Sequence, residues 1–268
     1  MSPKLIVLGV WGLETVGETP SFLLDVGEEK VVIDCCPACT RQLSLAGYSL
    51  PTINNIFISH VHADHMGGFP YFVFARSVQG RQFPKMKELT LYANPYTAEA
   101  AAQVVKIHYP KRGLSFQTKL LSSEDVSRVR LDDKMKLVSI PVDHTVPVLA
   151  CRLEIEKPKL KITYSADSLP CENFLRLAKG TDILIQEAFG TIQDYGTIYT
   201  RLKHSLGLHA GQIAKSINPK LLILFHMHAR YQEKKKAAEL VEEVRKNFDG
   251  EIVLPKDLQV IDLERYTS

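Results

Sequence analysis

One segment, Ile58–Gly68, restricts the folds open to this chain more than any other feature of its sequence. An apolar stretch runs directly into His60, His62, Asp64 and His65, and two glycines follow. The whole chain has nine histidines, so three within six positions is a strong local concentration. Imidazole and carboxylate groups suit Zn²⁺ and related divalent ions. The segment therefore predicts a strand that ends in a metal-binding loop, with a helix after it.

Apolar runs that favour β-structure recur along the chain, separated by turn residues and by helical patterns. The expected strands are Leu5–Val10, Ser21–Val26, Lys30–Asp34, Asn55–Ser59, Glu88–Ala93, Gln117–Leu121, Lys136–Val142, Leu149–Glu156, Lys161–Ser165, Asp182–Glu187, Leu221–His226 and Glu251–Leu254. The expected helices are Pro37–Ala46, Gly68–Val78, Tyr96–Ile107, Glu172–Lys179, Leu208–Ile217 and Gln232–Phe248. Closely spaced early strands and later strands that alternate with helices indicate an α/β fold, with two mixed sheets face to face and helices outside, in one continuous domain.

The composition narrows the class of protein. With 268 residues, 45% hydrophobic and 24% charged, the chain is typical of a globular protein and excludes disordered, collagen-like and disulfide-dense classes. A net charge of +3 is too small to indicate nucleic acid or anionic membrane as a partner. Five cysteines, few and odd in number, favour reduced thiols and a cytoplasmic location. The longest apolar run, Leu5–Leu13, is half the roughly 18 residues that a membrane span needs.

Three further candidate ligands come at or just after the ends of expected strands. His144 follows Pro141–Asp143, Asp167 follows Tyr164–Ala166, and His226 ends an apolar strand. Taken singly, a histidine or aspartate at a strand end is more often structural than ligating. Together with the histidine-rich segment, they favour a metal site with ligands from several strands.

The pattern His60-x-His62-x-Asp64-His65 after a strand resembles the signature of the metallo-β-lactamase superfamily. The resemblance implies a four-layer αβ/βα sandwich of two mixed β-sheets flanked by helices. It also implies two zinc ions per chain, with Mn²⁺ as an alternative, and a metal-bridged hydroxide as the attacking group. By the same resemblance, His60, His62 and His144 hold one metal, Asp64, His65 and His226 hold the other, and Asp167 bridges them.

The last third of the chain resembles the ribonuclease Z group more specifically. That group carries a Glu-Ala/Cys-Thr segment, a His-Ser-Thr segment before a helix, and a His-x-x-x-Arg-Tyr ending. This chain has Glu187-Ala188-Phe189, His204-Ser205-Leu206 and His226 followed by Arg230-Tyr231. The resemblance implies a phosphodiesterase or endonuclease that forms a homodimer.

Roles for individual residues follow from that resemblance. His204, held by Glu187, assists the leaving group, since a carboxylate that orients an imidazole helps it to donate a proton. Asp64 binds metal and accepts the proton of the attacking water, and Arg230 helps to hold phosphate. Ser205 is expected to cap the helix that follows it.

One departure from ribonuclease Z bears on the substrate. Ribonuclease Z commonly inserts a long arm that grips tRNA between the equivalents of His144 and Asp167. Here these two residues are 23 positions apart, and two strands and the Lys157–Lys159 turn fill the interval. The sequence therefore predicts a single metallo-β-lactamase-like domain over residues 1–268 without a tRNA-gripping arm, and a phosphodiester or small nucleic-acid substrate.

Two other readings stay open. A hydrolase on the same scaffold could act on a thioester or lactone, which does not need His204. A non-catalytic module could use the Cys36-x-x-Cys39 pair for redox chemistry. It could instead bind RNA through basic residues. The candidate basic residues are Arg76, Arg81, Lys85 and Lys87, or Lys106, His108, Lys111 and Arg112.

Overall fold

The structure is a computed structural model that describes residues 2–12 and 17–267. These residues form two compact units. The first contains residues 2–9, 17–121 and 256–263, and the second contains residues 10–12, 122–255 and 264–267. Leu13, the last residue of the apolar run noted above, lies outside the described residues.

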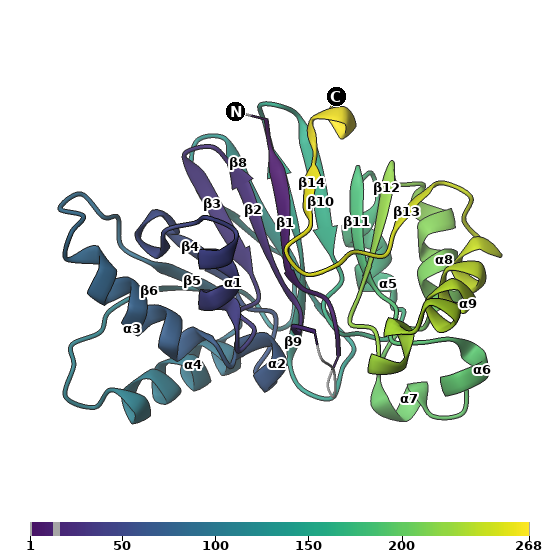
Figure 1. The fold of residues 1–268 in the computed structure, drawn as a ribbon, viewed down its shortest axis with the longest axis horizontal. Helices are drawn as coiled ribbons and strands as arrows, with labels where there is room; N and C mark the ends of the chain where they lie inside the picture. The colour runs from purple at the N-terminus through teal and green to yellow at the C-terminus, as the bar shows by residue number, and fades with distance from the viewer. Residues whose placement is uncertain (1, 13–16, 268) are drawn as a thin grey trace. The chain divides into compact units, whose positions relative to one another are not determined.

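The described residues of the first unit form a seven-stranded mixed sheet in the order β14-β1-β2-β3-β4-β5-β6 (Figure 1). Strands β14, β1, β2 and β3 pair antiparallel, and β3 to β6 pair parallel. The strand bounds are β1 Lys4–Gly9, β2 Ser21–Val26, β3 Glu29–Ile33, β4 Asn55–Phe57, β5 Thr90–Ala93, β6 Gln117–Leu120 and β14 Val260–Asp262.

Helices of the first unit pack against this sheet and bury a large apolar cluster. Side chains such as Leu8, Val32 and Ile56 of the strands meet Phe69 and Phe72 of a helix in this cluster. Because burial of each such side chain contributes about 1.5–3 kcal/mol, the cluster is a main source of the unit's stability. The helices are α1 Cys39–Leu45, α2 Ala63–Met66, α3 Phe69–Gly80 and α4 Pro95–His108, with the single turn η1 Leu50–Thr52.

The described residues of the second unit form another seven-stranded mixed sheet, in the order β13-β12-β11-β10-β9-β8-β7. Here β7 to β10 pair antiparallel and β10 to β13 pair parallel, the same division as in the first unit. The strand bounds are β7 Ser127–Arg130, β8 Met135–Val142, β9 Val148–Ile155, β10 Leu160–Tyr164, β11 Ile183–Glu187, β12 Leu221–Phe225 and β13 Glu251–Val253.

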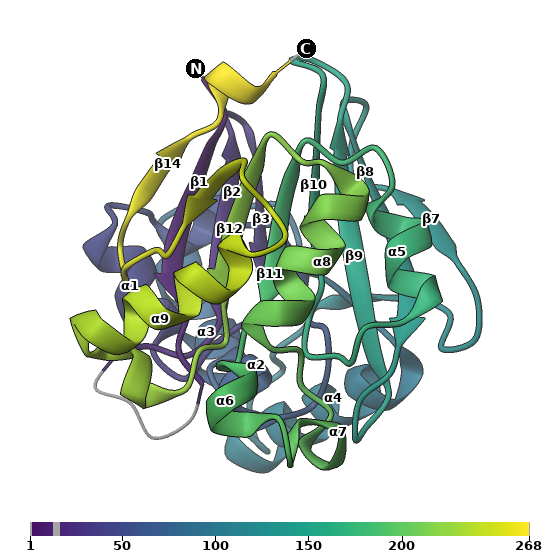
Figure 2. The same ribbon diagram turned by 90° about the vertical axis from the view of Figure 1, so that its right-hand side faces the viewer.

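Helices of the second unit cover its sheet, with α5 against β8 and β9 and α8 against β11 (Figure 2). Strands β11 and β12 are buried at every residue, which explains why each reads as an unbroken apolar run in the sequence. The helices are α5 Glu172–Ala178, α6 Ile192–Tyr195, α7 Tyr199–Leu202, α8 Gly207–Ile217 and α9 Lys234–Arg245, with the single turns η2 Ala229–Gln232 and η3 Glu264–Tyr266.

The α/β class with two mixed sheets and flanking helices, expected from the sequence, is confirmed. Every expected strand and helix is present, with ends that differ by a few residues. Sequence reasoning missed β7 and β14 and the short helices α2, α6 and α7. Strand β7 alternates half-buried and exposed positions at the edge of its sheet, so it has no apolar run to reveal it.

The parallel strands place the candidate functional residues. Asp34 follows β3, His60 comes shortly after β4, Asp167 comes shortly after β10, Glu187 ends β11 and His226 follows β12. In sheets of this kind, side chains beyond the carboxyl ends of parallel strands gather at one edge, where ligands bind. Within the described ranges, no helix is long and apolar enough to cross a membrane.

Candidate metal centre and acid–base pair

In the first unit, a tight loop carries His60, His62, Asp64 and His65; we call it the histidine loop. His62 caps the amino end of α2, where its carbonyl accepts hydrogen bonds from the backbone of His65 and Met66. The glycine at position 68 allows the close approach of the next segment, because a Cβ there would lie 2.0 Å from the carbonyl oxygen of Cys36. The loop is therefore fixed by backbone contacts within it and with the segment at Cys35 and Cys36.

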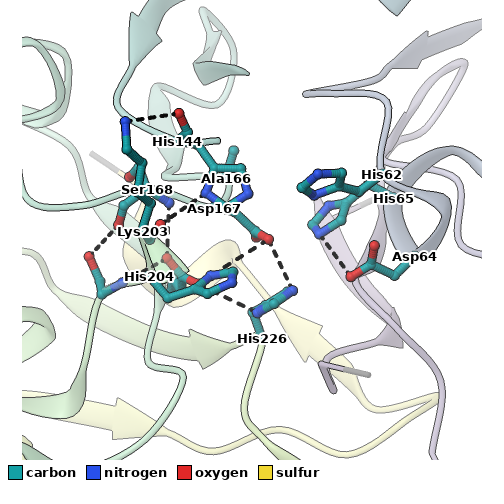
Figure 3. A network of polar contacts seen from close by, with 12 residues as sticks. His62, Asp64, His65, His144, Ala166, Asp167, Ser168, Lys203, His204 and His226 are labelled. Atoms are coloured by element: carbon teal, nitrogen blue, oxygen red, sulfur yellow. Dashed lines mark hydrogen bonds and ion pairs between the residues drawn. The ribbon is translucent and has the colours of Figure 1, made fainter. Parts of the chain in front are cut away.

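The side chains of the histidine loop lie close together. His60 Nε2 is 3.0 Å from His62 Nδ1. His65 Nε2 is 3.6 Å from a carboxylate oxygen of Asp64 (Figure 3). His60, Asp64 and His65 are buried, and His62 is half-buried. Imidazole nitrogens and a carboxylate gathered in this way form a donor set that fits a divalent cation such as zinc.

A single buried carboxylate orients two of these rings. Asp34 accepts hydrogen bonds from His65 Nδ1 at 2.7 Å and from the Ser59 hydroxyl at 2.9 Å. The other Asp34 oxygen accepts from the backbone N–H of Ser59 at 2.7 Å. The hydroxyl of Ser59 also lies 2.9 Å from His60 Nδ1. Since the Ser59 hydroxyl donates to Asp34, it is left as an acceptor for the Nδ1–H of His60.

These contacts assign the proton on each ring. With Nδ1 as the donor, His60 and His65 both keep Nε2 as the nitrogen with a lone pair, the form that coordinates a metal. All of Asp34, Ser59, His60 and His65 are fully buried, so water does not compete for these hydrogen bonds. Asp34 itself has a left-handed backbone (φ 57°), a conformation that aspartate tolerates better than most residues.

In the second unit, three of the predicted ligands come from three different strands. His144 lies just beyond β8, Asp167 just beyond β10 and His226 directly after β12. His226 Nε2 is 3.0 Å from a carboxylate oxygen of Asp167, and both side chains are buried (Figure 3). With Glu187 and His204, these residues form what we call the strand-end cluster.

His144 is oriented by a backbone carbonyl. Its Nδ1 donates to the carbonyl oxygen of Lys203 at 2.9 Å, which leaves Nε2 with the lone pair. Burial lowers the pKa of His144 below its ordinary value, so the ring is held in the neutral, coordinating form. Lys203 has a left-handed backbone (φ 56°), and its ammonium group pairs with Asp143 at 2.7 Å.

Glu187 is the hub of the strand-end cluster. One carboxylate oxygen accepts from His204 Nδ1 at 2.5 Å, and the other accepts from the backbone N–H of Ser168 and of Ser205. Glu187 is fully buried, whereas the side chain of His204 is 15% exposed. The predicted pairing of a buried carboxylate with a more accessible imidazole is therefore present, with the geometry of an acid–base pair.

The second unit also offers a donor set for a metal by itself. Asp167, Glu187, His204 and His226 each present a ligand atom, and these atoms all lie within 4.8 Å of one another. Two carboxylates and two imidazoles are the ligand types that zinc and manganese accept. Glu187 already accepts three hydrogen bonds, so its chemistry favours a role in orienting His204.

Arg230, expected to hold phosphate, and Ser205, expected to cap a helix, both have other partners in the structure. The guanidinium of Arg230 pairs with Asp194 at 3.2 Å and lies over the ring of Tyr195, with 45% of the side chain exposed. The prediction that Ser205 caps the following helix is wrong, because its hydroxyl donates to the carbonyl of Ser168 at 2.6 Å. Helix α8 is instead capped at Leu206, whose backbone N–H donates to His209 Nδ1.

The cysteine pair does not have the properties of a redox centre. Cys35, Cys36 and Cys39 are all fully buried. Burial raises the pKa of the Cys35 and Cys36 thiols, which keeps them protonated, whereas reactive cysteines have accessible thiols of lowered pKa. These cysteines instead have a structural role beside the histidine loop. The backbone N–H of Cys35 donates a hydrogen bond to the carbonyl of His65.

Arg76 is not part of a basic surface. It is 5% exposed and donates hydrogen bonds to the carbonyl of Ile53, the side chain of Asn54 and the carbonyl of Lys87. Lys87 pairs with Glu29 at 2.9 Å. These contacts make Arg76 a structural residue and weaken the case for an RNA-binding face in this segment.

Sequence reasoning missed the residues that orient the rings. Ser59 stands directly before the first histidine, a position that could have suggested its role. Lys203 acts through its backbone carbonyl, so its side chain carries no signal. The ring of Phe189 stacks on His204, a contact between residues 15 positions apart that no local pattern reveals.

Comparisons with known proteins identify the family and the fold of this chain. The sequence profile of the family described as anti-Pycsar protein Apyc1 matches residues 4–245. Ribonuclease Z from Methanothermobacter thermautotrophicus is 26% identical over 295 aligned positions, which cover 92% of this chain and 92% of that protein.

Solved structures share the fold. The metallo-β-lactamase fold protein YhfI from Bacillus subtilis matches with a TM-score of 0.78 and 22% identity, over 97% of this chain and 99% of that one. The short form of human tRNase Z matches with a TM-score of 0.76 and 20% identity, over 96% and 98% of the two chains. The expected metallo-β-lactamase fold is therefore confirmed.

Proposed function

Because the chain belongs to the anti-Pycsar protein Apyc1 family, in the ribonuclease Z-like branch of the metallo-β-lactamase superfamily, we propose that it is a dinuclear zinc phosphodiesterase for small substrates. It is a metal-dependent hydrolase of the phosphodiesterase and ribonuclease Z type. The observation that carries the choice of phosphodiester is the pair of Glu187 and His204, joined at 2.5 Å. An imidazole held in this way suits protonation of an alkoxide leaving group.

The proposed ligand sets are those that the resemblance to the superfamily implies. By resemblance to the superfamily, His60, His62 and His144 would hold one zinc ion, Asp64, His65 and His226 would hold the other, and Asp167 would contribute to both sites. The Nδ1–H donors of His60, His65 and His144 support this assignment, since each leaves Nε2 for a metal. A bound metal pair would lower the pKa of a water molecule and stabilise negative charge on the phosphoryl group.

The residues of the chain then divide the proton transfers. Asp64 accepts a proton from the attacking water as its oxygen bonds to phosphorus. His204 donates a proton from Nε2 to the oxygen of the leaving group as the P–O bond breaks, while Glu187 holds Nδ1–H and so keeps the ring aligned. Arg230 lies at an exposed position, where it can exchange Asp194 for a substrate phosphate.

The short connection between His144 and Asp167 supports a small substrate. Strands β9 and β10 pair antiparallel and occupy most of this interval, joined by residues 156–159. We propose a single catalytic domain without a tRNA-gripping arm. A cytoplasmic location and a homodimer are further parts of the proposal, supported by the reduced state of the five cysteines and by the resemblance to ribonuclease Z.

A substrate panel on zinc-loaded protein tests the proposal. It includes an aryl phosphodiester, a 3′-extended precursor tRNA, a thioester and a lactone. We expect the aryl phosphodiester to be hydrolysed much faster than the tRNA is cut, with no turnover of thioester or lactone. Efficient, salt-sensitive tRNA processing at nanomolar concentration would contradict the small-substrate proposal, and selective thioester or lactone hydrolysis would contradict phosphodiester chemistry.

A further inference from the structure

Phe189 lies two residues beyond Glu187 and contacts the proposed acid directly. Its ring stacks on the imidazole of His204, with ring centroids 4.8 Å apart and planes only 12° from parallel. Glu187 holds the same imidazole at its edge through Nδ1. The imidazole is therefore held in two independent directions, by a carboxylate in its plane and by an aromatic face above that plane.

The backbone of Phe189 is fixed on both sides. Its N–H donates to the carbonyl of Ser205 at 2.9 Å, and its carbonyl accepts from the N–H of His228 at 3.0 Å. These bonds tie Phe189 to the segment that carries His204 and to the segment that follows His226. A shift of either segment would therefore move Phe189 with it, so the stacking distance is set by the backbone.

The ring of Phe189 is also held by other aromatic side chains. Tyr195 meets it edge to face at a centroid distance of 4.9 Å, and His228 does so at 5.7 Å. Such edge-to-face contacts are favourable, and they restrict rotation of the Phe189 ring. The ring of Phe189 is thus held in a fixed orientation within the cluster.

We propose that Phe189 is a positioning residue that holds the imidazole of His204 in the orientation needed to protonate the leaving group. This inference rests on the proposed function. A hydrogen bond to Glu187 alone leaves the imidazole free to swing about the Nδ1–oxygen direction. The Phe189 face restricts that motion, together with the ring of His226, which also stacks on the imidazole at a centroid distance of 5.0 Å. Nε2 is thereby held in one direction.

Substitution by leucine tests the proposal, because leucine keeps apolar volume but has no flat face. Phe189→Leu should lower the rate on an alkoxide-leaving phosphodiester about 3- to 10-fold, which corresponds to about 0.6–1.4 kcal/mol and lies within the range that aromatic contacts of this kind contribute. On a nitrophenyl phosphodiester, whose leaving group needs little protonation, the rate should stay within about twofold. Phe189→Tyr, which retains the face, should behave as the unmodified protein on both substrates.

A double-mutant cycle separates positioning from general packing. In a His204→Ala background, Phe189→Leu should have no further effect, since the group that it orients is gone. Phe174→Leu is the matched control, because Phe174 is buried in α5 of the same unit. It should lower thermal stability without changing the ratio of the two rates. An additive effect in the cycle, or an equal loss on both leaving groups, overturns the proposal.

A readout independent of activity distinguishes failure of this inference from failure of the proposed function. Modification of histidines by diethyl pyrocarbonate, mapped by peptide mass, should be several-fold faster at His204 in Phe189→Leu and unchanged in Phe189→Tyr. The exposed His108 serves as the internal reference. An unchanged rate at His204 in Phe189→Leu overturns the inference. If the unmodified protein lacks phosphodiesterase activity while His204 becomes more reactive, the proposed function fails and the positioning remains.

Discussion

The histidine loop of the first unit and the strand-end cluster of the second reach similar chemistry by different routes. The loop presents four candidate ligands within six consecutive residues, oriented by the buried side chains of Asp34 and Ser59. The cluster draws His144, Asp167 and His226 from three strand ends spread over 82 residues. A compact motif can be positioned by one carboxylate, whereas dispersed ligands depend on the register of a whole sheet.

The largest effect is expected from loss of shared ligands in the strand-end cluster. Purified protein should contain close to two divalent ions per chain, mostly zinc, and Asp167→Ala combined with His226→Ala should remove metal and lower activity on the order of 10⁴-fold or more. Elemental analysis and kinetics measure both. Protein purified without metal, or full metal retention in the double variant, would show that these strand ends are not ligands.

The next largest effect concerns the acid within the same cluster. His204→Ala should lower the rate on an alkoxide-leaving phosphodiester on the order of 10²–10⁴-fold, with unchanged metal content, because the ring supplies a proton and not a ligand. Glu187→Gln should give a smaller loss, since it weakens the orientation of the ring. Partial recovery on a nitrophenyl substrate is expected for both variants. Equal losses on both leaving groups would exclude the acid role, and loss of metal in His204→Ala would make His204 a ligand.

The orienting groups of the two regions should respond differently to substitution. Asp34→Asn should weaken metal binding about 10- to 100-fold, because an amide nitrogen cannot accept the hydrogen bonds of His65 and Ser59. Lys203→Ala should change it by no more than about twofold, since it keeps the carbonyl that orients His144. It loses a half-exposed ion pair with Asp143 and a 3.3 Å hydrogen bond from its ammonium group to the carbonyl of His144. Titration with a competing chelator measures both. Equal sensitivity would mean that the two regions are not oriented by different means.

The smallest effect is expected from the thiols beside the histidine loop. Cys35, Cys36, Cys39 and Cys151 are buried, and the pKa values of Cys35 and Cys36 are raised. A thiol reagent should therefore label only Cys171 rapidly in the folded protein. Labelling of all five after denaturation is the control. Activity should be the same in mild oxidant and in reductant. Rapid labelling of Cys36, or activity that follows the redox state, would reopen the redox interpretation.

The sequence by itself determined those parts of the molecule that depend on residues close together in the chain. The apolar runs predict the buried parallel strands. Such strands are covered on both faces, so their sequences are continuously apolar and do not alternate between apolar and polar residues. The six residues from His60 to His65 indicate a metal-binding loop, because several ligand side chains reach one point only if the backbone turns tightly between them. The two glycines after the loop allow close backbone contacts, of Gly67 with the carbonyl of Ala63 and of Gly68 with the carbonyl of Cys36.

The tertiary structure alone decided which groups orient these side chains. The hydrogen bond from His144 to the carbonyl of Lys203 joins residues 59 positions apart, and the contact of Asp34 with His65 joins residues 31 positions apart. Neither contact produces a periodicity or a motif in the sequence. Every residue type has a backbone carbonyl, so the residue at position 203 does not reveal the contact. An aspartate after a strand is common, so Asp34 does not stand out either. The stacking of Phe189 on His204 likewise depends on how β11 and the segment before α8 are placed. Long-range geometry is set by packing, and packing is a property of the whole chain.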